Sequence, residues 1–270
     1  MSGLGTVTAF RASAAVMVVC AAVMWLLAAS PQEGGPRDVL WFIVDECVSD
    51  QLQNQDPKPC VQVNLRDGLE KGFAILKDIR GATQVLLIPT ARVSGIESPI
   101  ILAPDAPNYF ADAWEARTYI DEALHRTLPR DYIGLAINSA ANRSQDQLHI
   151  HVDCIRPDVH EALREREASI GNRWAPLDVS FSGHHYEAMW VPGERLGSNN
   201  PFRLLAERFP GGAQDMGDRT LVVVGSSRTN GVAGFVILED QVNRANHDSA
   251  GGEELLDHAC RIAMAAQPKN

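Results

Sequence analysis

Apolar runs of strand length alternate with polar turns along the middle of the chain. The expected strands are residues 72–80, 84–89, 132–138 and 144–153. A helix is expected over residues 108–126, because apolar residues recur there at helical spacing and Asn108 can cap its N-terminus. The order strand, strand, helix, strand, strand predicts an α+β fold in which an antiparallel sheet packs against helices.

The last of these strands, residues 144–153, alternates strictly between polar and apolar positions. Its polar positions from residue 147 onward are Gln147, His149, His151 and Asp153. Successive side chains of a strand point to opposite faces, so these four are expected on one face and the apolar residues between them in the core. Two imidazoles two residues apart can reach one small group, and histidine is well suited to a phosphate. The strand therefore predicts a phosphate-handling site.

A weaker pattern of the same kind follows in the C-terminal part. Strands are expected over residues 186–191, 220–226 and 234–239, and helices over residues 200–209 and 253–264. This order is similar to a second, degenerate copy of the sheet-and-helix unit that lacks its histidines. We expect this lobe to pack against the first and to complete the wall of its pocket.

The N-terminus holds a long apolar run. Residues 12–29 contain no charge over 18 positions, and Arg11 precedes them. About 20 apolar residues span a bilayer, so the run predicts a membrane anchor; a cleaved signal peptide with its site at residues 27–29 is the alternative. The charge of Arg11 favours a cytoplasmic N-terminus, which exports the rest of the chain. An amphipathic helix over residues 38–48 is expected to lead out of the membrane.

The cysteines agree with an exported protein. Apart from Cys20 in the apolar run, the chain has Cys47, Cys60, Cys154 and Cys260. An even number is typical of disulfides in an oxidising compartment, and the lack of any C-x-x-C spacing disfavours zinc. Four cysteines allow three connectivities, of which we predict Cys47 with Cys60 and Cys154 with Cys260. Free buried thiols are the alternative.

Composition narrows the class of ligand. The 270 residues are 45% hydrophobic and 21% charged, enough for a globular fold with one or two lobes. The formal net charge of −10 and the aromatic content of 6% argue against a nucleic-acid surface, which needs clustered Lys and Arg or a stacking platform. A phosphate group must therefore be bound by a local site.

These features together give the chain a family resemblance. Alternating histidines on the last strand, after a hairpin formed by residues 76–79 and 86–89 and after Asn138, are similar to the histidine-triad (HIT) superfamily. Within it, the anchored N-terminus, the GIESP segment from Gly95 and the run HIHVDCIRP from His149 resemble the bacterial CDP-diacylglycerol pyrophosphatases. The closer resemblance covers most of the chain after the anchor, and it implies a HIT-like antiparallel sheet with a degenerate second half.

The resemblance implies that His149 is a nucleophile. A HIT strand offers three positions, which either Gln147, His149 and His151 or His149, His151 and Asp153 could fill. The second assignment turns a carboxylate toward the phosphate, and like charges a few ångströms apart cost on the order of a few kcal/mol, so we choose the first. Neutral His149 would then attack the α-phosphorus of CDP-diacylglycerol and form a cytidylyl-histidine, which water hydrolyses.

Roles for the surrounding residues follow from the same resemblance. His151 and Gln147 would stabilise oxygens that gain charge in the transition state, together with donors from the loop before them. Asp78 would accept hydrogen bonds from the ribose hydroxyls, and Asn138 would hold the phosphate side of the nucleotide. The expected catalytic residues are His149, His151 and Gln147, and the expected substrate-binding residues are Lys77, Asp78, Asn138, Ser144 and Gln145.

Substrate and location are implied as well. The substrate would be CDP-diacylglycerol in a membrane and the products CMP and phosphatidate, with no cofactor, no metal ion and no nucleic acid; a homo-oligomer is compatible with this. The location would be a bacterial inner membrane, with the catalytic domain on the periplasmic side. The expected division is an anchor at 1–30, a linker with its disulfide at 31–70, a catalytic core at 71–160 and a C-terminal lobe at 161–270.

Two other classes remain open. The first is a metallohydrolase with an ion on His149, His151 and Asp153, because an H-x-H strand can be part of a metal site. The second is a non-catalytic protein that binds a nucleotide-lipid. His184 and His185 face opposite ways on a strand and are expected at the surface. The remaining histidines are expected to be solvated and without partners: His125, His160, His247 and His258.

Overall fold

The computed structural model describes residues 37–209 and 215–265. The apolar run at residues 12–29, which we predicted to be a membrane anchor, lies outside these residues. Within the described ranges, no helix has both the length and the apolar character needed to span a bilayer.

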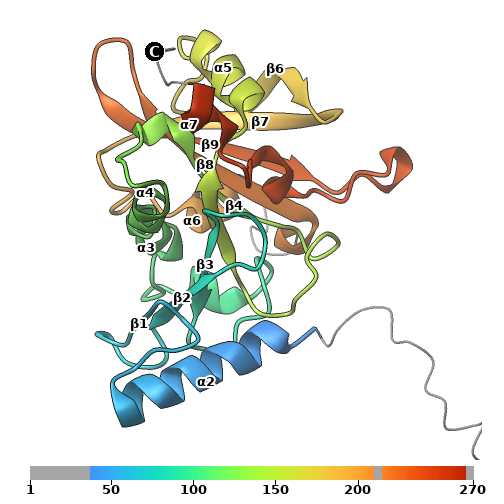
Figure 1. Cartoon of the computed structure of the whole chain (residues 1–270). Helices are drawn as coiled ribbons and strands as arrows, with labels where there is room; N and C mark the ends of the chain where they lie inside the picture. The colour runs from blue at the N-terminus through green and yellow to red at the C-terminus, as the bar shows by residue number, and fades with distance from the viewer. Residues whose placement is uncertain (1–36, 210–214, 266–270) are drawn as a thin grey trace, which may run out of the picture. The chain divides into compact units, whose positions relative to one another are not determined.

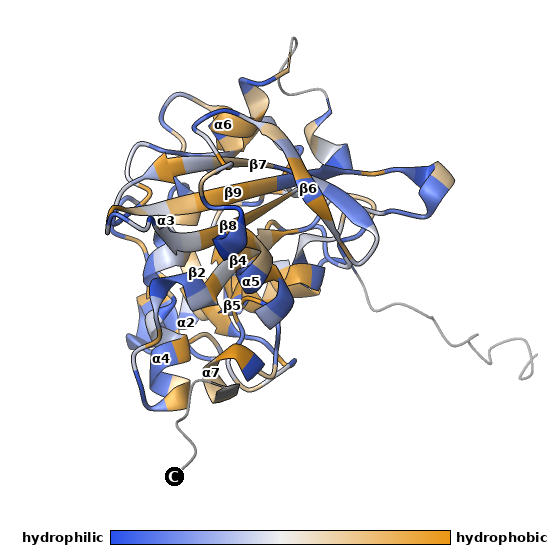
Figure 2. Cartoon of the chain, turned by 90° about the horizontal axis from the view of Figure 1, so that it is seen from above, coloured by the Kyte–Doolittle hydropathy of each residue, from blue (hydrophilic) through white to orange (hydrophobic). Residues whose placement is uncertain are grey.

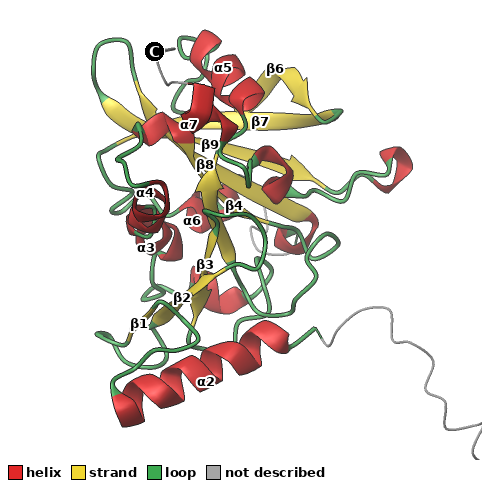
Figure 3. Ribbon diagram, in the orientation of Figure 1, coloured by secondary structure: helices red, strands yellow, loops and turns green. Residues whose placement is uncertain are grey.

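Nine strands form a single antiparallel sheet with the order β1-β2-β3-β5-β4-β8-β9-β7-β6 (Figures 1 and 3). In chain order the strands are β1 (Gln62–Asn64), β2 (Phe73–Lys77), β3 (Val85–Pro89), β4 (Ile133–Ile137), β5 (Ile150–Cys154), β6 (Ala175–Phe181), β7 (His184–Pro192), β8 (Arg219–Ser227) and β9 (Ala233–Gln241). The α-helices are α2 (Val39–Asn54), α3 (Tyr109–Glu115), α4 (Thr118–Leu124), α5 (Pro157–Glu165), α6 (Pro201–Ala206) and α7 (Arg261–Ala265). Short 3-10 helices are η1 (Pro99–Leu102), η2 (Arg130–Tyr132), η3 (Met216–Asp218), η4 (Arg244–Asn246) and η5 (Gly252–Leu255). Helices and one antiparallel sheet confirm the predicted α+β class.

The sheet consists of two halves with the same connectivity. Each half is a hairpin, a helix and a second hairpin: β2-β3, α3 and β4-β5 in the first, and β6-β7, α6 and β8-β9 in the second. In each half the fourth strand lies between the second and the third. The halves join where β4 pairs antiparallel with β8, with Leu135 opposite Val223. From Arg37 onward the chain therefore forms one compact unit rather than two separate domains.

Different helices cover the two faces of the sheet. Leu86 and Ile88 on β3 pack with α2, whereas Val85 and Leu87 join the larger core cluster that contains α3. This alternation follows from the strand geometry, which sends successive side chains to opposite faces. Figure 2 shows apolar residues concentrated on central strands such as β8 and β9. Because His151 is paired with Leu86, the histidines lie on the face that α2 covers.

Several predicted elements differ in extent from those observed. The helix predicted at 108–126 is capped by Asn108 as expected, since its side chain accepts a hydrogen bond from the Ala111 N–H. It divides into α3 and α4 at Ala116 and Arg117, where the Arg117 guanidinium donates to the Trp114 carbonyl at 2.6 Å. The helix predicted at 38–48 continues to the end of α2. Strand β1, strand β6 and helix α5 were not predicted.

The prediction of one continuous helix over residues 253–264 is wrong. The segment is η5 followed by extended chain, and α7 begins only at Arg261. Leu256 forms a β-bridge with Ile155, and the Asp257 N–H donates to the Cys154 carbonyl at 2.8 Å. The backbone of residues 256–257 therefore bonds to the end of the histidine strand instead of forming the helical hydrogen bonds that the spacing of its apolar residues predicted.

Both predicted disulfides are present. Cys47 is bonded to Cys60 and joins α2 to the start of β1, whereas Cys154 at the end of β5 is bonded to Cys260. The second bridge spans 106 residues of sequence, so it fixes the C-terminal segment beside the histidine strand.

Candidate active site

A cavity of about 380 Å³ opens beside the two histidines on the face that α2 covers. This volume is typical of sites for small ligands. The cavity has a polar lining, and an apolar lining from α2 and the β2–β3 hairpin: Val39, Leu40, Ile43, Leu76, Ile79 and Leu86. Seven of the predicted site residues line it: Lys77, Asp78, Asn138, Ser144, Gln145, His149 and His151. A ligand with both a charged part and a hydrocarbon part fits this lining.

His149 lies immediately before β5 and is 7% exposed. Its Nδ1 atom is 2.7 Å from the Gln147 carbonyl oxygen. A carbonyl oxygen only accepts hydrogen bonds, so Nδ1 carries the proton and Nε2 keeps a free lone pair. Burial lowers the pKa of His149, which keeps the ring neutral at pH 7. The residue therefore has the tautomer and charge of a nucleophile.

His151 has the opposite arrangement of donor and acceptor. Its Nδ1 atom is 3.1 Å from Gln84 Nε2, whose amide also donates to Asp78 Oδ2 at 2.7 Å. Because the amide donates, Nδ1 accepts and Nε2 carries the proton; Nε2 is buried and has no partner in the described structure. Burial, followed by the neighbouring His149, lowers the pKa of His151 to about 4. Neutral His151 is thus a hydrogen-bond donor next to His149, with ring centroids 5.0 Å apart.

Gln147, predicted to be catalytic, is not among the residues that line the cavity. It is fully buried, and its amide nitrogen donates to the carbonyls of Pro89 and Ala91 at 3.0 and 2.8 Å. Its amide oxygen accepts from the Val93 N–H at 3.3 Å. These bonds fix the loop after β3 to the segment before β5, so the geometry gives Gln147 a structural role. The same bonds explain why β5 begins at Ile150 rather than at residue 144.

Asp78 and Lys77 lie at the end of β2, on the rim of the cavity. The Asp78 carboxylate accepts from the Arg80 N–H at 2.8 Å in addition to Gln84. Lys77 Nζ donates to the carbonyls of Asp78 and Gly81. The two side chains stabilise the turn and leave part of the Asp78 carboxylate available to a ligand.

Asn138 holds an acidic residue that sequence reasoning missed. Its amide oxygen accepts from the Glu253 N–H at 3.0 Å, and its amide nitrogen is 3.4 Å from Glu253 Oε2. Glu253 Oε1 lies 3.5 Å from His151 Nδ1. Glu253 belongs to η5, so the C-terminal segment contributes directly to the cavity.

Ion pairs hold the loop before the histidines, residues 139–146, in place. Arg143 makes a bidentate ion pair with Glu97 and a further contact with Asp146, which also pairs with Arg37. In this loop Gln145 accepts a hydrogen bond from the Leu40 N–H in the first turn of α2. The loop and α2 are therefore joined where they line the cavity.

His258, which we expected to be solvated and without a partner, is half-buried and paired with the fully buried Asp153. Its Nδ1 atom is 2.9 Å from Asp153 Oδ2, and its Nε2 atom is 3.4 Å from Glu253 Oε1. The hydrogen bond to Asp153 raises the pKa of His258. Asp153 also accepts from Thr83 at 2.6 Å, so both of its oxygens have partners and it is not free to join His149 and His151 around a metal ion.

Two further expectations for histidines need correction. His160, expected to be solvated and without a partner, has its Nε2 atom 2.8 Å from Asp131 Oδ2. His184, expected at the surface, is only partly exposed and lies among three carboxylates. The exposed histidines are His125, His185 and His247.

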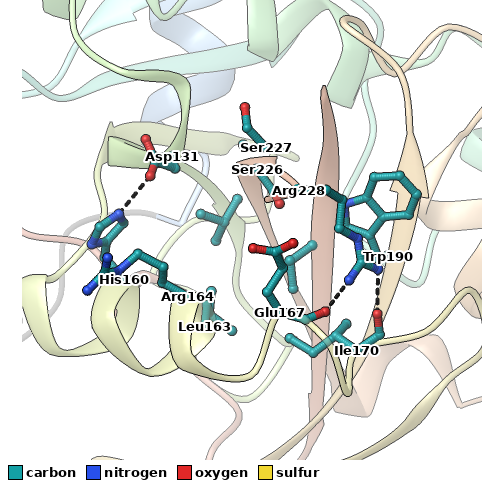
Figure 4. Close-up of a pocket in the computed structure, with 13 residues that line it drawn as sticks. Asp131, His160, Leu163, Arg164, Glu167, Ile170, Trp190, Ser226, Ser227 and Arg228 are labelled. Carbon is teal, nitrogen blue, oxygen red and sulfur yellow. Dashed lines mark hydrogen bonds and ion pairs between the residues drawn. The ribbon is translucent and has the colours of Figure 1, made fainter. Parts of the chain in front are cut away.

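A second pocket lies on the same face of the sheet, in the second half (Figure 4). Asp153, Gly134, Val224 and Val236 are in register across four strands, so Val224 and Val236 in this pocket share the face of the histidine strand. The pocket holds only about 40 Å³, and in it Arg228 donates to the Glu167 and Ile170 carbonyls. β9, the counterpart of β5, carries no histidine. β9 therefore offers no counterpart of the pair His149 and His151.

Comparison with known families agrees with the residues in the cavity. The model of a family described as CDP-diacylglycerol pyrophosphatase matches residues 35–264, which include both histidines, η5 and all four bridged cysteines. The match covers most of the chain. The chain therefore belongs to the CDP-diacylglycerol pyrophosphatase family, whose members hydrolyse the diphosphate bond of CDP-diacylglycerol to release CMP and phosphatidate.

Proposed function

We propose that this chain hydrolyses CDP-diacylglycerol through a covalent cytidylyl-histidine on His149. Nε2 of His149 attacks the α-phosphorus, the bond from that phosphorus to the bridging oxygen breaks, and phosphatidate leaves with the bridging oxygen. Water then attacks the same phosphorus, the phosphorus–nitrogen bond breaks, and CMP is released. Two displacements at one centre avoid a direct attack of water on an anionic diphosphate.

The hydrogen bond between His149 Nδ1 and the Gln147 carbonyl is the observation that carries this proposal. It holds the proton on Nδ1, and the lowered pKa keeps the ring uncharged, so the lone pair on Nε2 is available at pH 7. A base held in the other tautomer, as His151 is, would not attack. The two neighbouring rings thus support different roles.

His151 is suited to stabilise the transition state. Its Nε2–H donor is unpartnered and adjacent to the nucleophile, so it can donate to a phosphoryl oxygen as charge builds there. Removing one donor of this kind typically lowers turnover by about 10²–10³-fold. Asn142 also lines the cavity and can add an amide donor. Gln147 does not line the cavity, and its amide nitrogen donates to two backbone carbonyls, so the proposal gives it no such role.

The rest of the cavity suits the two ends of the substrate. Asp78 and Asn138 supply acceptors and donors for the nucleotide, and Ser144 and Gln145 add polar groups beside it. The apolar lining from α2 suits the first part of the acyl chains. Ile79 is fully exposed and Phe42 is 63% exposed, which supports a position next to a bilayer surface.

The architecture supports the HIT-like assignment in the same way. Two halves with identical strand order, joined through β4 and β8, are what a fused pair of sheet-and-helix units would give. In this proposal the first half is catalytic and the second completes the fold. The bridged cysteines favour an oxidising compartment, consistent with an anchor at residues 12–29 and a periplasmic domain.

The test uses CDP-diacylglycerol labelled at the α-phosphorus and rapid acid-free quenching. Wild-type protein should carry the label on His149 as a phosphoramidate, and His149→Ala should lose both the label and at least 10³-fold in turnover. His185→Ala is the matched control, because His185 is exposed. A fully active His149→Ala variant would refute the proposal, and single-step transfer of label to water with no bound label would refute the covalent step.

A further inference from the structure

Three carboxylates converge on one imidazole at a place remote in sequence from the catalytic histidines. His184 starts β7, Asp240 lies near the end of β9, Asp248 follows in the loop, and Glu254 belongs to η5. From His184 Nδ1 the carboxylate oxygens lie at 3.0 Å for Glu254, 3.4 Å for Asp248 and 3.9 Å for Asp240. One donor atom each from His184, Asp240 and Asp248 lie within 4.8 Å of one another.

Buried polar atoms in this cluster lack partners. Asp240 is more than nine-tenths buried, yet its Oδ2 has no hydrogen-bond donor in the described structure, while its Oδ1 accepts from the Gln241 N–H. His184 Nδ1 is likewise buried and forms no well-aligned hydrogen bond in the described structure, although Glu254 Oε1 lies 3.0 Å from it. A buried polar atom without a partner typically costs about 1–3 kcal/mol. Both atoms belong to the group of donors that converge, which indicates a ligand between them.

The charges of the cluster are not balanced by protein groups. In the part of the chain that the structure describes, His184 is the only basic side chain that forms an ion pair with Asp240 or Asp248. Carboxylates buried together repel one another unless a cation or a proton lies between them.

We propose that His184, Asp240, Asp248 and Glu254 bind a divalent metal cation. Donor atoms at about 2.0–2.2 Å from one ion lie roughly 3 to 3.5 Å from each other. The carboxylate oxygens lie 3.0 to 3.9 Å from His184 Nδ1, and the donor atoms of His184, Asp240 and Asp248 lie within 4.8 Å of one another, so a small contraction would bring them around one ion. One imidazole and three carboxylates form a mixed nitrogen and oxygen set, which suits Zn²⁺ or Mn²⁺ better than Ca²⁺, a cation that prefers oxygen ligands only. The site is distinct from the catalytic cavity and does not require the proposed mechanism.

The bound ion would position the catalytic cavity. Glu254 follows Glu253 in η5, so a metal ion on Glu254 holds that turn against β7 and β9 of the second half. Glu253 meanwhile contacts His151 and His258 in the first half. The Tyr186 hydroxyl donates to Glu254 Oε1 at 3.0 Å and secures the same ligand. The ion thus links the two halves of the sheet and is structural rather than catalytic.

The test measures binding directly. The purified full chain is treated with chelator, dialysed and titrated with Zn²⁺ and with Mn²⁺ by calorimetry, and bound metal is counted by mass spectrometry. The wild type should bind one equivalent of at least one of them, and its Tm should rise with that metal. His184→Gln and Asp240→Asn should bind at least tenfold more weakly. The matched control His185→Gln changes the exposed neighbour and should bind like the wild type.

A second comparison separates this site from the catalytic one. His149→Ala should keep its metal, whereas an ion held by the catalytic histidines would be lost from that variant. The proposal is overturned if the wild type binds neither ion stoichiometrically, or if His184→Gln binds as tightly as the wild type. It is also overturned if Asp240→Asn without metal is more stable than the wild type with it, because the carboxylates would then share a proton instead. Circular dichroism checks that each variant is folded.

Discussion

His149 and His151 show how two identical side chains on one strand acquire different chemistry. The difference comes from one hydrogen bond each: a backbone carbonyl accepts from Nδ1 of His149, and the Gln84 amide donates to Nδ1 of His151. The first leaves a lone pair at Nε2 and the second leaves a proton there. At the scale of residues, the partner at Nδ1 decides whether Nε2 offers a lone pair or a proton, and the roles that we propose for the two histidines rest on this difference.

His258 gives a prediction at the same scale. Its hydrogen bond to Asp153 raises its pKa above 6.5, so the ion pair contributes its full stability below pH 6.5 and loses it as the pH rises through the raised value. The difference in free energy of unfolding between wild type and His258→Gln should therefore be largest at pH 5.5 and shrink toward pH 9. Urea denaturation at a series of pH values measures it. His185→Gln should show no such trend, and a difference that grows with pH would contradict the assignment.

At the scale of elements, the segment from η5 to α7 matters most for the site. It carries Glu253 and His258 to the histidine strand, although it lies about 100 residues away in sequence. Its conformation is set by a β-bridge to Ile155 and by the bond between Cys154 and Cys260. A local helix would have separated the two side chains from the cavity.

The two disulfides should therefore differ in their contribution. In the chain-entropy model, a bridge across 106 residues stabilises by about 4.7 kcal/mol and one across 13 residues by about 3 kcal/mol. Cys154→Ser with Cys260→Ser should lower the free energy of unfolding more than Cys47→Ser with Cys60→Ser. Urea denaturation of both double variants compares them. A larger loss from the shorter loop would show that strain or residual structure, and not loop length, dominates.

At the scale of the whole molecule, the continuous sheet makes the two halves one cooperative unit. β4 pairs with β8 along four residue pairs, and Trp114 of α3 contacts Phe235 of β9 with ring centroids 4.9 Å apart. The C-terminal segment then returns to the first half. One continuous core cluster contains buried residues of both halves.

This arrangement predicts a single unfolding transition. Leu135→Ala removes a fully buried side chain beside the junction and should cost about 2–5 kcal/mol. The midpoint should fall equally when followed by far-UV circular dichroism and by tryptophan fluorescence, which reports on Trp114 of the first half as well as on Trp174 and Trp190 of the second. Two separate transitions, with only the first shifted, would show that the halves unfold independently.

The sequence by itself determined the features that depend on neighbouring residues. Alternation placed His149 and His151 on one side and the apolar residues between them in the core, because backbone geometry fixes a period of two for any strand. Asn108 capped its helix for a similarly local reason. The predicted cysteine pairing is confirmed. A bridge from Cys154 to Cys260 also implies that their sequence neighbours Asp153 and His258 lie close together, a contact that could have been predicted from the pairing.

Only the tertiary structure decided which distant groups meet. Gln147 alternates in phase with the histidines, but contacts with Pro89 and Ala91 turn it into the interior. Glu253 reaches His151, and His184 reaches Asp240 and Asp248, because strand order and register bring together segments that no local pattern relates. The physical reason is that side-chain period is a property of the local backbone, whereas strand pairing depends on the packing of the whole core.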